Sequence, residues 1–187
     1  MKNEEFGISK ESIYEIAKIV SFKMKKIKEI LFDEYDIKFS NKNLSEIIGK
    51  IFEKETAEYL DKNTEFKVIN AESDKDPDLC FYKNGEIIKN IEIKVTSTKS
   101  SWTGGEFSKR PFDYLLISWG GDYNEYFIVY THIEKEEWDS NIAKGYYGPS
   151  FKVKKLNEKD DKIILLGSIN HKGTGIIREN LFQTKLL

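Results

Sequence analysis

The pattern of hydrophobic and polar positions divides this chain into a helical first third and a strand-rich middle. Between residues 12 and 32 apolar side chains recur every three or four positions, which predicts an amphipathic helix. A second helix is predicted from Asn43 to about Leu60, with Asn43 and Glu46 forming a capping box at its start. Five strands are predicted in the short apolar runs that follow, at residues 66–70, 79–82, 87–95, 112–119 and 123–131.

This order of elements predicts an α/β fold in which helices flank a central mixed β-sheet. The last third is expected to hold a short helix at 134–143, an aromatic loop at 145–149 and a strand at 163–166. A chain of 187 residues with 39% hydrophobic content suits one domain that buries about 70% of its unfolded surface. We therefore expect a single domain over residues 1–187, with a helical N-terminal segment at 1–42, a catalytic core at about 43–131 and a C-terminal region at about 132–187.

Composition narrows the classes of protein that need to be considered. No apolar run approaches the roughly 20 residues that cross a bilayer, and the N-terminus lacks the hydrophobic stretch of a signal peptide. We therefore expect a cytoplasmic protein with no membrane partner. The net charge of −2 argues against a protein that coats nucleic acid by bulk charge. Basic residues nevertheless gather between residues 94 and 110, which leaves room for a local basic surface.

Two acidic positions and a lysine are grouped by one predicted hairpin. The segment Asp76-Pro77-Asp78 precedes a strand, Lys83-Asn84-Gly85 forms the turn, and Glu92-Ile93-Lys94 lies in the strand that follows. Two carboxylates can hold a hard cation such as Mg²⁺, and a lysine beside them can stabilise an attacking hydroxide or the charge on a phosphate. The pattern is typical of a divalent-metal phosphodiesterase.

The turn decides whether these side chains share a face of the sheet. A two-residue turn at 84–85 would make Asp78 and Glu92 point to opposite faces. A three-residue turn, with Gly85 in the left-handed position of a G1 bulge, brings both acids and Lys94 to one face. A bulge elsewhere in the hairpin would give the same result. The metal-site interpretation therefore predicts the three-residue turn.

Acid-x-lysine triplets such as Glu92-Ile93-Lys94 also arise by chance in a chain with so many charged residues. Three others begin at Asp36, Glu65 and Asp160, so the triplet alone carries no weight. Only Glu92 and Lys94 lie in an apolar strand, where burying both charges is costly unless something compensates them. A structural ion pair between the two is one compensation, and a metal site is the other, which we favour.

These residues resemble the PD-(D/E)XK nuclease superfamily, whose members share the restriction-endonuclease-like fold. The resemblance rests on Pro77-Asp78, thirteen intervening residues and Glu92-Ile93-Lys94, and on the helical segment Gly49-Lys50-Ile51-Phe52-Glu53 before them. It implies a restriction-endonuclease-like sandwich in which Asp78, Glu92 and the backbone carbonyl of Ile93 ligate one or two Mg²⁺ ions. It also implies that Lys94 positions or activates the attacking water, and that Glu53 holds a second-shell water or a second metal. The alternative for Glu53 is an ordinary surface acid of the helix.

The polar, basic segment after Lys94 is expected to face DNA. Its hydroxyl groups, amides and basic side chains suit phosphate contacts, Arg110 could read a guanine, and Trp102 could stack on a base. The alternative is that Trp102 and Phe107 only anchor this loop to the core. The DNA-binding candidates are Lys99, Ser101, Trp102, Lys109, Arg110 and, from the C-terminal tail, Arg178.

Together these features predict a Mg²⁺-dependent endonuclease that hydrolyses phosphodiesters of double-stranded DNA. We favour a type II restriction endonuclease, for which the resemblance implies a homodimer that cuts one strand with each subunit. Two alternatives stay open. One is a DNA-repair or structure-selective nuclease, and the other is a catalytically silent DNA-binding module of the same fold.

Overall fold

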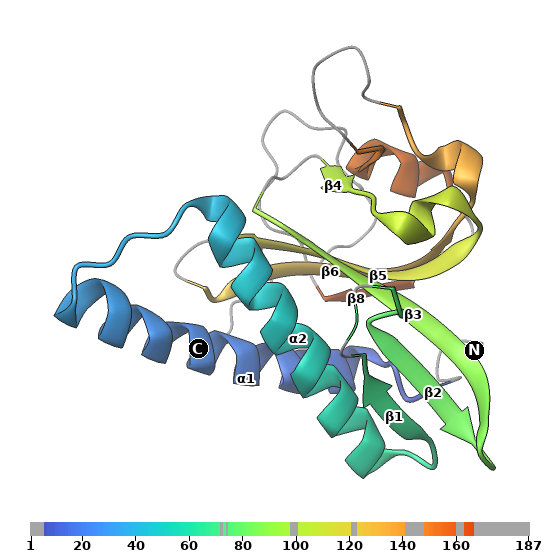
Figure 1. Cartoon of the computed structure of the whole chain (residues 1–187), viewed down its shortest axis with the longest axis horizontal. Helices are drawn as coiled ribbons and strands as arrows, with labels where there is room; N and C mark the ends of the chain where they lie inside the picture. The colour runs from blue at the N-terminus through green and yellow to red at the C-terminus, as the bar shows by residue number, and fades with distance from the viewer. Residues whose placement is uncertain are drawn as a thin grey trace.

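The computed structural model describes residues 6–71, 73, 75–97, 101–120, 123–140, 148–159 and 163–166. Its centre is a six-stranded sheet in the order β1-β2-β3-β5-β6-β8, and all neighbours are antiparallel except β3 and β5 (Figure 1). The predicted mixed central sheet is thus confirmed, with mostly antiparallel pairing. Its strands are β1 (Lys67–Asn70), β2 (Leu79–Lys83), β3 (Glu86–Thr96), β5 (Phe112–Gly120), β6 (Glu125–Ile133) and β8 (Ile163–Leu166).

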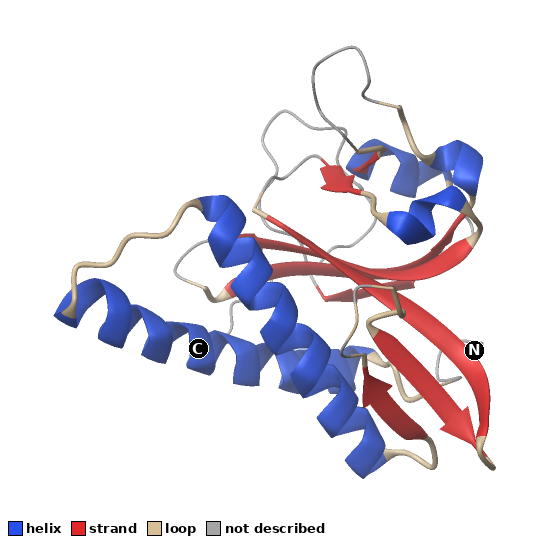
Figure 2. Cartoon of the chain, in the orientation of Figure 1, coloured by secondary structure: helices blue, strands red, loops and turns tan. Residues whose placement is uncertain are grey.

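Two long helices pack on one face of this sheet (Figure 2). Helix α1 (Lys10–Ile27) is capped by Ser9 and continues as η1 (Lys28–Glu34), a π-helix that the sequence did not predict. Helix α2 (Asn41–Asn63) begins two residues before the predicted start, because Ser40 is its N-cap and accepts a hydrogen bond from the amide of Asn43. The predicted capping box at Asn43 is therefore wrong. Within the described residues, no helix is long and apolar enough to cross a membrane.

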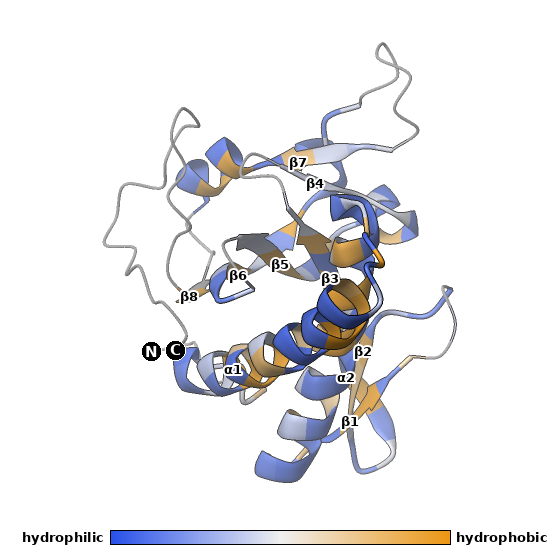
Figure 3. Cartoon of the chain, turned by 90° about the vertical axis from the view of Figure 1, so that its left-hand side faces the viewer, coloured by the Kyte–Doolittle hydropathy of each residue, from blue (hydrophilic) through white to orange (hydrophobic). Residues whose placement is uncertain are grey.

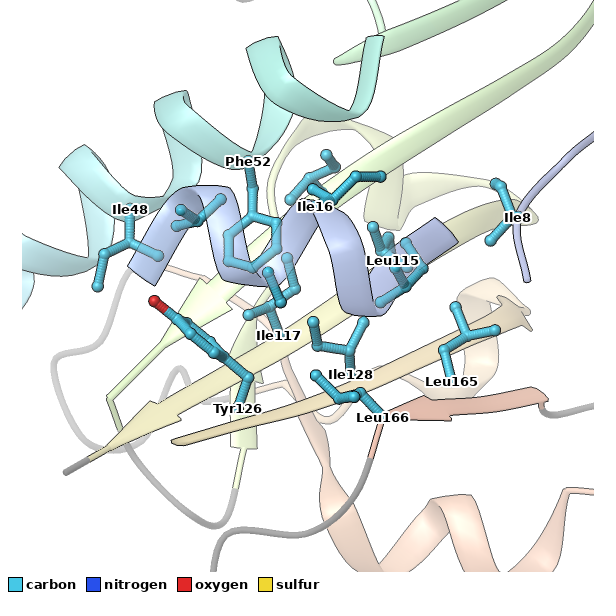
Figure 4. Packing of buried hydrophobic residues seen from close by; sticks show 14 of the residues in the cluster. Ile8, Ile16, Ile48, Phe52, Leu115, Ile117, Tyr126, Ile128, Leu165 and Leu166 are labelled. Carbon is cyan, nitrogen blue, oxygen red and sulfur yellow. The ribbon is translucent and has the colours of Figure 1, made fainter. Parts of the chain in front are cut away.

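The buried sides of the helices and the sheet form the larger hydrophobic core. In Figure 4, Ile16 of α1 and Phe52 of α2 meet side chains from β5, β6 and β8. The rings of Phe52 and Tyr126 touch edge to face, with 5.3 Å between their centroids. The predicted apolar stripe of the first helix is confirmed, since Ile13, Ile16, Ala17, Val20 and Met24 are all fully buried.

The opposite face of β5 and β6 is covered by short elements. A two-stranded ladder of β4 (Ser101–Thr103) and β7 (Ser150–Lys152) packs there with three 3₁₀ turns, η2 (Glu106–Lys109), η3 (Lys135–Glu137) and η5 (Val153–Glu158). The predicted helix at 134–143 is only the turn η3 in its described part, and residues 141–147 lie outside the described residues. Both faces of β5 and β6 are covered, which is why these strands read as nearly continuous apolar runs.

The hairpin between β2 and β3 differs from the predicted turn. Asn84 and Gly85 both have positive φ, at 53° and 83°, which is the two-residue type I′ turn favoured by an Asn-Gly pair. The three-residue turn is therefore wrong. A β-bulge restores the parity instead, because Tyr82 pairs with Ile87 whereas Phe81 pairs with Lys89.

The bulge has a direct effect on the acidic positions. Leu79 pairs with Ile91, and both are fully buried in the core beneath the helices. Extending this register by one residue places Asp78 opposite Glu92, on the face away from that core. The bulge was the second route that the sequence left open, and it gives both acids the common face that a shared site requires.

Candidate active site

A single polar pocket of about 300 Å³ gathers all four predicted catalytic residues. Helix α2 contributes Glu53, the residue before β2 is Asp78, and β3 contributes Glu92 and Lys94. The segment at 105–107, between β4 and β5, forms another wall of the pocket. The structure thus brings together groups that are up to 41 residues apart in the sequence. The remaining lining residues are Lys50, Ala71, Ser73, Asp76 and Ile93.

Asp78 is fixed where β2 begins beside the middle of β3. Its Oδ2 accepts a hydrogen bond from the amide of Ile93 at 2.7 Å, and its own carbonyl accepts from the amide of Ala71 at 3.2 Å. The amide and carbonyl of one strand residue point to the same side, so the carbonyl of Ile93 also faces this end of β2. The predicted ligands Asp78 and Ile93 are therefore neighbours through a direct contact.

Glu92 and Lys94 form the ion pair that was the alternative explanation for two buried charges. Lys94 Nζ lies 2.5 Å from Glu92 Oε1. The other oxygen, Glu92 Oε2, is buried and has no hydrogen-bond partner among the described residues. Burial raises the pKa of Glu92 and the negative charge of Asp78 raises it further, while Lys94 and a backbone hydrogen bond from Asp78 oppose the shift. The ion pair therefore compensates one oxygen of this carboxylate, and the lone pairs of the buried Oε2 are available to a cation.

Glu53 is buried, so the alternative of an ordinary surface acid is wrong. Only 6% of the residue is exposed, and its Oε2 accepts a hydrogen bond from Lys50 at 2.7 Å. Asn70 at the end of β1 approaches the same oxygen at 3.4 Å. Burial raises the pKa of Glu53, the negative charge of Asp78 adds to the rise, and Lys50 opposes it. Glu53 is thus an acid held at an electrostatic cost beside a second acid.

The electrostatic cost of burying the Glu53 carboxylate predicts that a neutral residue at this position stabilises the protein. A raised native pKa means that the folded state holds its proton more tightly than the unfolded state. Stability therefore falls as pH rises from the ordinary glutamate pKa through the raised one. Glu53→Gln removes the penalty while keeping an acceptor for Lys50, so we expect its free energy of unfolding at pH 7 to exceed the wild-type value by about 1 kcal/mol. Urea unfolding at pH 7 and at about pH 4 measures the free energy of unfolding of both proteins. The difference between Glu53→Gln and wild type should shrink at the lower pH.

Glu58→Gln is the matched control for this prediction. Glu58 lies five residues further along the same helix, its side chain is 61% exposed, and it has a lysine partner as Glu53 does. We expect this change to alter stability by less than about 0.5 kcal/mol. A Glu53→Gln protein less stable than wild type at pH 7 would show that the Lys50 interaction outweighs the burial of the charge.

Some of the predicted DNA-binding residues are buried, and others lie outside the described residues or at the surface. Trp102 is 1% exposed, its Nε1 donates to the carbonyl of Ile117 at 2.8 Å, and its ring stacks on Phe127. It is a core anchor and is not exposed to stack on a base, so the alternative interpretation of this residue holds. Phe107 is buried in the same cluster. Lys99 and Arg178 lie outside the described residues.

The other three candidates lie at or near the protein surface. Ser101 is half-buried in β4, Lys109 is exposed and pairs with Glu106 at 2.5 Å, and Arg110 is exposed. The guanidinium of Arg110 packs over two aromatic rings, 5.2 Å from the centroid of Phe107 and 5.4 Å from that of Phe112. Because Phe107 also lines the acidic pocket, Arg110 is held close to it.

Sequence reasoning did not single out three residues that shape the pocket. Lys50 is the partner of Glu53, Asn70 links Glu53 to the carbonyl of Asp78, and Gly105 packs against Lys94. A Cβ atom at position 105 would lie 3.6 Å from Lys94 Nζ, which is an ordinary contact distance, so a side chain there would touch the lysine. Lys50 lay inside the helical segment quoted for the resemblance and Gly105 inside the segment expected to face DNA, whereas nothing in the sequence marked Asn70.

No cluster of three or more His, Cys, Asp or Glu side chains in the described parts of the chain is arranged to hold a metal ion. Mg²⁺ does not require one, because it keeps several waters and is often bound by one or two carboxylates together with substrate phosphates. Asp78, Glu92 and the Ile93 carbonyl fit that smaller ligand set, and the unpartnered Glu92 Oε2 is an oxygen suited to it. The arrangement can thus hold one hard cation next to a lysine.

Comparison of the chain with protein-family models, with curated proteins and with solved structures finds no match.

Proposed function

We propose that this protein is a metal-dependent phosphodiesterase that acts on nucleic acid. The observation that carries the proposal is the side-by-side placement of Asp78 and Glu92 on one face of the sheet, with Lys94 beside them and one buried Glu92 oxygen unpartnered. Within this class we favour a type II restriction endonuclease on double-stranded DNA. The corresponding fold proposal is a restriction-endonuclease-like sandwich, supported by the hairpin, the parallel pairing of β3 with β5 and the α2 glutamate.

The roles of the residues follow from their contacts. Asp78, Glu92 and the carbonyl of Ile93 would hold Mg²⁺, which when bound supplies positive charge that lowers the pKa of a water and offsets the charge of a phosphate. Lys94 would orient the attacking water and stabilise negative charge on the phosphate, with its ammonium held in place by Glu92 Oε1. Glu53 would accept a hydrogen bond from a further water at the pocket edge.

Several features support DNA as the substrate. Lys50 and Lys94 line the pocket, and Arg110 stands next to it on the rings of Phe107 and Phe112, so cations flank the acids on more than one side. Such cations suit contacts to the phosphates on either side of a scissile bond. An arginine fixed on aromatic rings is also pre-organised for bidentate contact with guanine, which favours sequence-specific cleavage.

Digestion of a long DNA tests both the proposed nuclease activity and its proposed sequence specificity. We expect the purified protein to cut it in Mg²⁺ or Mn²⁺ into discrete fragments, and EDTA to stop the reaction. A smear would replace the restriction enzyme with a nonspecific or structure-selective nuclease. Binding to DNA with no cleavage of any duplex in either metal would make the protein a silent DNA-binding module.

A further inference from the structure

Two buried polar groups without partners lie in the core between the sheet and the β4–β7 ladder. In Figure 3 this ladder lies on one side of β5 and β6, and the helices α1 and α2 lie on the other side. Tyr114 and Trp138 are buried on the ladder side, where their rings meet edge to face with 5.3 Å between the centroids. The Tyr114 hydroxyl and the Trp138 indole nitrogen have no hydrogen-bond partner among the described residues.

Tyr114 also stands directly beside Glu92, whose Oε2 is a third buried atom without a partner. The two residues are paired across the parallel strands β5 and β3, so their side chains leave the same face of the sheet next to each other. Burial raises the pKa of the Tyr114 hydroxyl, the negative charge of Glu92 raises it further, and Arg110 opposes the rise. The hydroxyl is therefore protonated at neutral pH and able to donate a hydrogen bond near this carboxylate.

The three groups have complementary hydrogen-bonding capacity. An indole N–H only donates, a hydroxyl both accepts and donates, and a carboxylate oxygen only accepts. In the order Trp138, Tyr114, Glu92, each group can therefore satisfy the next, by a hydrogen bond that is direct or passes through one buried water. A phenylalanine at position 114 would pack against the same rings without burying a hydroxyl, so the hydroxyl carries a cost that a hydrogen bond to Glu92 would offset.

We propose that Tyr114 is a positioning residue for Glu92, with its hydroxyl hydrogen-bonded to Glu92 Oε2 and to the indole of Trp138. The carboxylate would then be held by Lys94 at one oxygen and by Tyr114 at the other. A carboxylate oxygen has two lone pairs, so Oε2 keeps one for the cation. Groups that orient a metal-binding side chain typically contribute ten- to a hundredfold to metal affinity. Glu92 as a metal ligand belongs to the proposed function, on which this inference therefore rests.

Binding of Mn²⁺ to the whole protein tests this role without requiring nuclease activity. Electron paramagnetic resonance of the free ion measures the affinity, with Mn²⁺ as the probe in place of Mg²⁺. Tyr114→Phe should bind Mn²⁺ at least tenfold more weakly than the wild type. Tyr126→Phe is the matched control, because it also removes a buried hydroxyl without a partner among the described residues, but from the core against Phe52. It should leave the affinity for Mn²⁺ unchanged.

Urea unfolding without metal gives a second, independent measurement. Tyr126→Phe should raise the urea midpoint, because it removes an unsatisfied hydroxyl from a core. Tyr114→Phe should lower the midpoint of the wild type, because its hydroxyl is hydrogen-bonded. It should not lower the midpoint of Glu92→Met, in which the acceptor is missing.

Two results would overturn the role of Tyr114. One is a Tyr114→Phe protein that binds Mn²⁺ as tightly as the wild type, and the other is a Tyr114→Phe protein that is stabilised as much as Tyr126→Phe. A wild type that binds no Mn²⁺ contradicts the proposed function instead. In that case the comparison of urea midpoints with and without Glu92 still decides whether Tyr114 holds this carboxylate.

Discussion

Asp78→Asn is expected to lower the rate of Mg²⁺-dependent DNA cleavage on the order of a thousandfold, which corresponds to about 4 kcal/mol of transition-state stabilisation. The amide keeps an oxygen that can accept from the amide of Ile93, so the start of β2 should stay in place. What is lost is the negative charge that would hold the cation beside Glu92. Single-turnover cleavage at saturating protein, with circular dichroism as a check on folding, measures the effect.

Asp76→Asn is the matched control. Asp76 lines the same pocket two residues earlier, is exposed, and its side chain makes no hydrogen bond or ion pair with the described residues. Its substitution should change the rate by less than about tenfold. If Asp78→Asn cleaves at the wild-type rate, the catalytic site lies elsewhere or the observed activity comes from a contaminant. If both variants lose activity equally, the pocket acts through its total charge and Asp78 has no special role.

Trp102→Ala is expected to have the largest effect on stability, a loss of about 3–5 kcal/mol in the free energy of unfolding. The side chain is fully buried, stacks on Phe127 and donates to the carbonyl of Ile117. Its removal leaves a cavity and takes the indole donor away from the carbonyl of Ile117 on a central strand. Because the same segment leads to Gly105 beside Lys94, cleavage should fall as well. Urea unfolding monitored by circular dichroism measures the stability.

Trp102→Phe serves as the companion variant, because it retains a ring for the contact with Phe127 and loses only the indole donor and part of the volume. It should be destabilised less than Trp102→Ala. If Trp102→Ala leaves the urea midpoint unchanged and weakens only the binding of DNA, Trp102 contacts the nucleic acid and the buried position does not describe its role.

Much of the sheet was predictable because its strands carry strong local signals. The observed bounds of β5 and β8 lie within one residue of those predicted from apolar runs between turn residues. The hairpin was harder to predict. Its Asn-Gly turn followed the usual preference, but the bulge at residues 81–82 depends on which residues the core accepts. Leu79 and Phe81 had to be buried together with Ile91, and only the extra residue in β3 allows that pairing.

The candidate site, like the sheet, could be predicted in part from the sequence. Asp78, Glu92 and Lys94 were identified from their positions in the predicted hairpin and Glu53 from the family resemblance, and all four line one pocket. The role of Trp102 was not settled by its neighbours in sequence, because a tryptophan in a polar segment looks the same whether it is buried or exposed. Its burial depends on pairing with a strand that lies about 50 residues further along the chain.

The bulge in the β2–β3 hairpin also separates the pairing register of the hairpin tip from that of its base. The pairs nearest the turn, such as Lys83 with Glu86, follow one register, and the pairs that lead to the acids follow another. The inner register is held by the core, while Ile87 and Ile88 on the outer side are exposed. A dye or an affinity tag inserted at the Asn84–Gly85 turn would therefore alter the outer pairs alone. The tip offers a place to label or immobilise this protein without shifting the residues proposed to carry out its chemistry.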